Sequence, residues 1–65
     1  MKYTKTLRAK VAAAKRGDTL TFDGIPQHFV YGDRLILHYK IAEWNAWIPS
    51  TAVTGLRRRG VRVGY

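Results

Sequence analysis

The fold is best predicted by one stretch of sequence, FVYGDRLILHYKI, residues 29–41. A Gly-Asp pair separates two runs that are rich in β-branched and aromatic residues, which is the pattern of a β-hairpin. In the second run, apolar residues alternate with more polar ones from Leu35 to Ile41. This period of two places the apolar side chains on one face of a strand. We therefore expect a hairpin at the centre of the fold.

The length of the hairpin loop determines which side chains share a face, because a shift of one residue moves every side chain to the opposite face. A two-residue loop pairs Val30 with Leu35 and sends Phe29 to the polar face. A three-residue loop, Gly32-Asp33-Arg34, pairs Tyr31 with Leu35 instead. We expect the three-residue loop, because it places both aromatic side chains on the apolar face.

The residues before the hairpin predict a helix over residues 4–16. Thr4 or Thr6 can cap its first turn, and Gly17 can end it. Helical spacing gathers a narrow apolar stripe by which the helix would dock. This stripe consists of Tyr3, Leu7, Val11 and Ala14.

A short strand is expected over residues 18–23, because Leu20 and Phe22 alternate with polar residues there. Asp23-Gly24 is a turn signal. Pro26 has no backbone N–H to donate, so it marks the start of the next strand or a strand at the edge of the sheet.

The second half of the chain leaves alternatives open. Residues 42–48 form either a strand with Trp44 inside and Trp47 outside, or a turn over residues 43–46 followed by a short strand. Residues 56–65 form either a last strand with alternating apolar residues or a basic tail.

One local resemblance bears on the fold. Trp47–Val53, WIPSTAV, resembles the end of SH3-like small barrels, where a strand runs into a turn of 3₁₀ helix and the last strand follows. Gly17–Leu20, GDTL, resembles the beginning of an early strand of that fold. The usual acidic loop is missing, and the N-terminal helix is not part of the barrel. SH3-like barrels bind peptides in some proteins and nucleic acids in others, so the resemblance does not determine the function.

These patterns predict one domain over residues 1–65 and an α+β fold class. We expect an N-terminal helix packed on a small, bent antiparallel sheet of three to five strands over residues 19–53, resembling an SH3-like barrel. A domain of this size buries only about 60% of the surface of its unfolded chain, so self-association would help to stabilise it.

The composition excludes several classes of function. There is no cysteine, and the two histidines and four acidic residues show no zinc-ligand spacing. His28 and His38 are expected to be half-exposed strand residues. No paired-carboxylate site, nucleophile elbow or phosphate-binding glycine loop is present. We therefore expect no enzyme, no metal and no cofactor. No secretory signal or membrane-spanning run is visible, which favours a cytoplasmic location.

The charge is unevenly distributed along the chain. Residues 1–17 carry +6, residues 18–56 carry −2 and residues 57–65 carry +4, which together give the net charge of +8. Segregated positive charge favours an anionic partner. The alternative is solvated charge that keeps a small protein soluble and binds no partner.

We expect a small nucleic-acid-binding protein, with DNA preferred over RNA, that contacts backbone phosphates through Lys and Arg. An exposed Trp47 or Tyr31 would add base stacking. The candidate binding residues are Lys5, Arg8, Lys15, Arg16, Arg57, Arg58, Arg59, Arg62, Trp47 and Tyr31.

The alternative is a protein–protein interaction module, such as an accessory or phage-type regulator that docks on the acidic face of a larger enzyme or transcription complex. Its apolar anchor would be Trp47. A homodimer that pairs through the edge strand near Pro26, or through residues 61–65, is compatible with either function.

Overall fold

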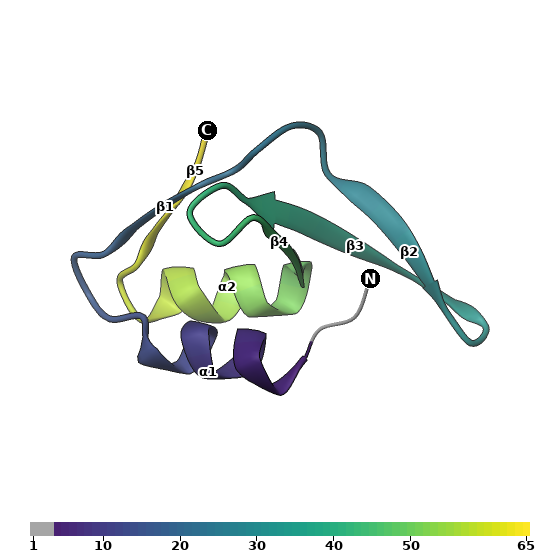
Figure 1. The fold of residues 1–65 in the computed structure, drawn as a ribbon, viewed down its shortest axis with the longest axis horizontal. Coiled ribbons are helices and arrows are strands. Elements are labelled where there is room, and N and C mark those ends of the chain that lie inside the picture. Colours follow the sequence, from purple (N-terminus) through teal and green to yellow (C-terminus); the bar gives the residue numbers. More distant parts are fainter. Residues whose placement is uncertain (1–3) are drawn as a thin grey trace.

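The structure is a computed structural model that describes residues 4–65. In this range the chain forms two helices and five strands (Figure 1). The strands make a three-stranded antiparallel sheet in the order β2-β3-β4 and a separate parallel pair of β1 and β5. The predicted α+β class is confirmed, but an SH3-like barrel is not. The elements are α1 (Lys5–Ala13), β1 (Thr19–Thr21), β2 (Gln27–Tyr31), β3 (Arg34–Ile41), β4 (Ala46–Pro49), α2 (Ser50–Arg58) and β5 (Arg62–Gly64).

Helix α1 begins as predicted but ends early. The Thr4 hydroxyl oxygen accepts a hydrogen bond from the Leu7 N–H at 3.3 Å. The helix ends at Ala13 rather than at residue 16. The reason is a competing turn, because the Lys15 N–H donates to the Asp18 carboxylate at 3.0 Å, and the Asp18 N–H donates to the Lys15 carbonyl at 3.0 Å.

The apolar stripe predicted for α1 packs on the core where the structure describes it. Leu7 and Ala14 are buried, and Val11 packs against the same core. Tyr3 lies outside the described residues. The stripe therefore docks α1 through few side chains, and other contacts are needed to hold the helix in place.

The expected three-residue hairpin loop is wrong. Val30 pairs with Leu35, and Tyr31 pairs with Arg34, so the loop has only two residues. Gly32 has φ of +63°, while Asp33 is not in the left-handed region, which is the geometry of a type II′ turn. This turn matches the twist of the two strands.

The register places Phe29 on the face opposite to the core, where it packs with His38. The centroid of the Phe29 ring lies 4.7 Å from that of His38, and the Tyr31 centroid lies 5.5 Å from it. The His38 Nδ1–H donates to the Ile36 carbonyl at 3.0 Å, so Nε2 accepts from the Tyr31 hydroxyl at 3.3 Å. Trp47 covers Phe29 from β4, at 5.3 Å between ring centroids. His38 is only 2% exposed, which corrects the expectation of a half-exposed histidine.

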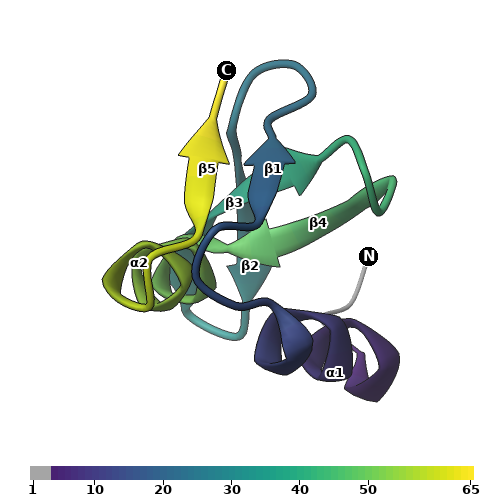
Figure 2. The same cartoon turned by 90° about the vertical axis from the view of Figure 1, so that its left-hand side faces the viewer.

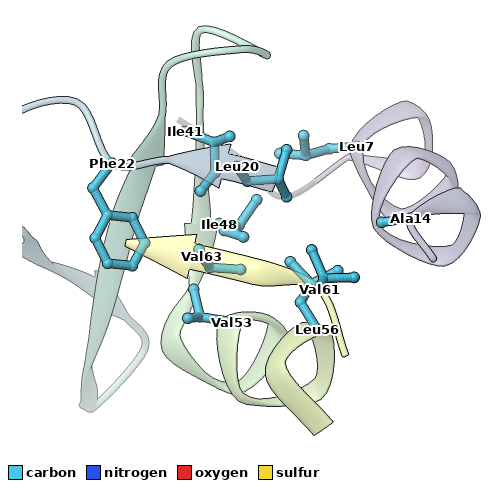
Figure 3. Close-up of a cluster of buried hydrophobic side chains, with 10 residues drawn as sticks. All are labelled: Leu7, Ala14, Leu20, Phe22, Ile41, Ile48, Val53, Leu56, Val61 and Val63. Atoms are coloured by element: carbon cyan, nitrogen blue, oxygen red, sulfur yellow. The ribbon is translucent and has the colours of Figure 1, made fainter. Parts of the chain in front are cut away.

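The core lies between the other face of the sheet, both helices and the β1–β5 pair (Figure 3). Leu20 and Phe22 are both buried, as their alternation predicts. Of the apolar face of β3, only the end at Ile41 reaches the core fully, whereas Leu35 is 68% exposed. The core residues are Leu7, Ala14, Leu20, Phe22, Ile41, Ile48, Val53, Leu56, Val61 and Val63.

Helix α2 replaces the turn of 3₁₀ helix that the resemblance to SH3-like barrels implied after Pro49. Pro49 is the N-cap residue, and the helix continues through Gly55 to Arg58. A glycine inside a helix costs about 1 kcal/mol, but burial of Val53 and Leu56 gains about 1.5–3 kcal/mol each. Packing therefore outweighs the local tendency of the chain to leave the helix.

The structure also decides between the alternatives for residues 42–48 and for residues 56–65. Residues 42–45 form a turn from which Trp44 packs against the core, and β4 follows. Residues 62–64 form a strand and not a tail, but Leu20 and Val63 are partners in a parallel pair, whereas an antiparallel sheet was expected.

The turn between β3 and β4 is tied to β1 by Glu43. Its carboxylate accepts hydrogen bonds from the Thr21 N–H at 2.7 Å and the Thr21 hydroxyl at 3.1 Å. These bonds favour the charged form, so the Thr21 N–H lowers the pKa of Glu43. Within residues 4–65, neither helix is long and apolar enough to cross a membrane.

Candidate nucleic-acid interface

Both helices run in the same direction and end at the same side of the molecule (Figure 1). Figure 2 views the molecule from that side. The Gly17 N–H donates to the Gly60 carbonyl at 3.3 Å, and the Arg62 N–H donates to the Asp18 carbonyl at 2.8 Å. These bonds join the segment after α1 to the segment after α2. They bring together six basic residues, which we call the basic end: Lys15, Arg16, Arg57, Arg58, Arg59 and Arg62.

Arg59 connects the two helices directly. Its Nη2 donates to the Val11 carbonyl at 2.6 Å, and its Nη1 donates to the Ala12 and Ala14 carbonyls at 3.2 Å each. The last carbonyls of a helix lack partners within the helix and carry partial negative charge. The guanidinium group of Arg59 donates hydrogen bonds to these carbonyls and places a positive charge beside them. Arg59 therefore has a structural role.

Arg57 and Arg16 also pack against the protein. Arg57 Nη2 donates to the Val63 carbonyl at 3.0 Å, and its Cζ lies 5.8 Å from the centroid of the Phe22 ring. Arg16 lies so close to Gly60 that a Cβ atom there would come within 3.0 Å of the Arg16 Cγ. These contacts fix the two side chains but do not remove their charge, so both still contribute to the local field.

Lys15, Arg58 and Arg62 are the available cations of the basic end. All three residues are exposed, and within residues 4–65 their side chains make no hydrogen bond or ion pair. Asp18 is the acidic residue nearest in sequence, and its carboxylate already accepts the Lys15 N–H. The three side chains are therefore free to contact an anion.

Beside the basic end, a hollow of about 520 Å³ lies over β1 and β5. Arg57, Arg62 and Tyr65 line it, together with backbone and small side chains of the two strands. Tyr65 is 81% exposed, and its ring meets Phe22 edge-on at 5.2 Å between centroids. Its ring is therefore the exposed aromatic group next to the cations. Sequence reasoning did not choose Tyr65, because the strand pairing that carries it to this place has no local signal.

The other predicted site residues lie elsewhere. Lys5 and Arg8 occupy the first turns of α1, and a nine-residue helix places its two ends about 13 Å apart. Tyr31 and Trp47 belong to the aromatic cluster that covers His38. Figure 1 shows the hairpin tip, which follows Tyr31, at the opposite end of the molecule from the ends of both helices. The structure thus brings together six of the ten candidates.

Within the described residues, no three His, Asp or Glu side chains gather into a group that could hold a metal ion. No protein-family model matches the sequence, and no curated protein or solved structure matches it either. The function is therefore inferred from the arrangement of residues 4–65 and from their chemistry.

Proposed function

We propose that this protein binds nucleic acid through backbone phosphates at the basic end. The proposal rests on one observation. Basic residues from two distant parts of the sequence, residues 15–16 and residues 57–59 and 62, lie together at one end of the molecule. Lys and Arg side chains bind phosphates and release condensed counterions, which favours association with any sequence. A cluster of this kind attracts a polyanion more strongly than the same charges spread over the surface would.

The residues have different roles in this proposal. Lys15, Arg58 and Arg62 contact phosphates, because their side chains are exposed and uncommitted. Arg57 and Arg59 hold the ends of the helices and add to the positive potential. Neither set forms a recognised base-reading element, so binding is independent of sequence, with DNA as the first partner to test. A cytoplasmic location fits the absence of cysteine.

The test is fluorescence anisotropy with a labelled random duplex and a labelled single strand, titrated at several salt concentrations. The double variant Arg58→Ala with Arg62→Ala should reduce the slope of log K against log salt by about 2, since each phosphate contact contributes about 0.9. If the unmodified protein prefers the single strand and the Tyr65→Ala variant does not, the Tyr65 ring stacks on bases.

The matched control is Lys5→Ala with Arg34→Ala, which removes the same charge from residues outside the basic end. It should leave the slope nearly unchanged. Equal losses in the two double variants would mean that net charge alone drives binding and would refute the site. Absence of any binding at low salt would refute the function, because a net charge of +8 with a clustered cationic end should bind at least weakly.

The alternative partner, an acidic protein surface, would use the same exposed cations. Its expected anchor, Trp47, is half-buried against Phe29 and therefore offers little apolar area. Such a partner would bind in a pull-down while random DNA bound poorly at every salt concentration.

A further inference from the structure

The hairpin arm, residues 25–37, projects from the body of the protein (Figure 1). Some of its apolar side chains are exposed, among them Val30 at 71% and its cross-strand partner Leu35 at 68%. The arm carries Asp33 and Arg34 as its only formal charges at pH 7, so it is electrically neutral while the chain carries +8. Apolar, neutral surface that protrudes from a strongly basic protein indicates a contact surface.

The open side of the arm is the edge of β2. Tyr31 and Arg34 close a two-residue loop and therefore form a hydrogen-bonded pair, and such pairs alternate along antiparallel strands. The backbone N–H and C=O groups of Val30 and His28 consequently point away from β3. Within residues 4–65, no other strand pairs with this edge.

The usual protections of an edge strand are lacking in β2. Natural edges are blocked by Lys, by inward charges, by bulges or by a covering element. Gln27–Tyr31 contains no charged residue, and its pairing with β3 has no bulge. Pro26 blocks the ladder only before the strand begins, so the strand itself is competent to pair.

We propose that two copies of this chain associate by antiparallel pairing of their β2 edges, about a twofold axis at Phe29. In this register, Val30 lies opposite His28 of the partner subunit and His28 lies opposite Val30 of the partner subunit. Within each pair, the two residues exchange N–H···O=C hydrogen bonds. The two pairs together give four new hydrogen bonds and join the two sheets into one of six strands. The two Phe29 rings meet at the axis and join the two aromatic clusters.

The distribution of charge favours a second copy at this edge. The basic end and the hairpin tip lie at opposite ends of the longest axis, which measures 35 Å. Charges separated by much more than the Debye length, about 8 Å at physiological salt, hardly repel each other. Pairing through β5 would instead bring Arg62 of the two copies together, so the β2 edge is the better choice.

The size of the contact determines how tight the dimer is. A five-residue strand is only about 17 Å long, so edge pairing makes a small contact compared with the area of about 1,000 Å² that a stable specific interface buries. The dimer should therefore exchange with monomer and depend on protein concentration, while changing little with salt.

Sedimentation velocity over an about 100-fold range of protein concentration tests the pairing, because mass action shifts a weak dimer within such a range. Val30→Pro removes an outward N–H, which an edge strand tolerates in the monomer. The symmetric dimer loses two hydrogen bonds, so its dissociation constant should rise about 10- to 30-fold. The control Tyr65→Ser removes another exposed apolar side chain and should leave the dissociation constant unchanged.

Hydrogen exchange of the unmodified protein gives an independent readout. The amides of His28 and Val30 should become protected as protein concentration rises, while those of Phe29 and Tyr31 are protected at all concentrations. A chain that stays monomeric over the whole range overturns the proposal. A dimer that is equally stable in a folded Val30→Pro variant overturns the β2 edge as its interface.

Discussion

Replacement of Arg59 by alanine should loosen the attachment of α1. The variant loses three hydrogen bonds from one guanidinium group to carbonyls in the last turn and at the C-cap of α1. At a partly exposed site, each contributes about 0.5–1 kcal/mol, and the charge at the helix C-terminus contributes up to about 1 kcal/mol more. We therefore expect a loss of about 2–3 kcal/mol. A chain of this length has a total stability of only about 3–10 kcal/mol.

The assay is thermal unfolding followed by circular dichroism. A loss of this size should lower Tm by about 10–20 °C in a small domain. The matched control is Arg58→Ala, which removes the same charge from the adjacent position but no hydrogen bond within residues 4–65. Its effect on the free energy of unfolding should stay within about 0.5 kcal/mol. The Tm of Arg59→Lys should lie between those of Arg58→Ala and Arg59→Ala, because an ammonium group keeps the charge but not the planar set of donors.

Equal Tm values for Arg58→Ala and Arg59→Ala would refute this assignment of roles. Loosening should be local, because within residues 4–65 the Arg59 guanidinium group donates only to carbonyls of residues 11, 12 and 14, at the end of α1. Hydrogen exchange should accelerate at the amides of α1 more than at those of β3. Uniform acceleration over the whole chain would mean that Arg59 acts on global stability and not as a link between the helices.

Two further predictions follow from the turns. Folding lowers the pKa of Glu43 below its ordinary value of 4.5, so the stability it contributes is complete above pH 4.5 and is lost as the pH falls through the lower, folded value. Glu43→Gln should therefore be less stable than the unmodified protein in urea at neutral pH, with a difference that closes below pH 4.5; a difference that persists in acid would contradict the role of the carboxylate. Gly60→Ala should cost about 1–2 kcal/mol in chemical denaturation, because Gly60 has φ of +88° and a Cβ atom would meet Arg16; an unchanged midpoint would mean that the segment relaxes without strain.

Much of the local structure could be predicted from short-range patterns. The strand over residues 34–41, the cap at Thr4 and the burial of Leu20 and Phe22 all agree with their sequence patterns. The predicted three-residue loop was wrong because the alternation of apolar residues does not show that aromatic rings can pack on a histidine on the other face of the sheet. The rings of Phe29 and Tyr31 pack on His38, so they do not need the apolar face.

The errors in the second half have a common physical cause. Pro49 and Gly55 are local signals that end helices, whereas α2 is stabilised by burial of Leu56 against distant residues. The parallel pairing of β1 with β5 likewise depends on contacts more than forty residues apart in sequence. The charge segregation of the candidate site is visible in the sequence. The internal use of Arg57 and Arg59 is not, because their carbonyl partners are brought to them only by the tertiary fold.

The proposed dimer has a consequence for the nucleic-acid measurement. The twofold axis at Phe29 lies about 10 Å short of the hairpin tip, so each basic end would lie about 25 Å from the axis along the 35 Å length of the molecule. The two basic ends would then be about 50 Å apart, which corresponds to about 15 base pairs at 3.4 Å each. A longer duplex could therefore contact both ends, and the linkage would raise the apparent affinity without any new contact. A duplex of about 12 base pairs spans about 40 Å and reaches only one basic end. The salt slope on this short duplex tests the phosphate contacts alone, whether or not the β2 edges pair.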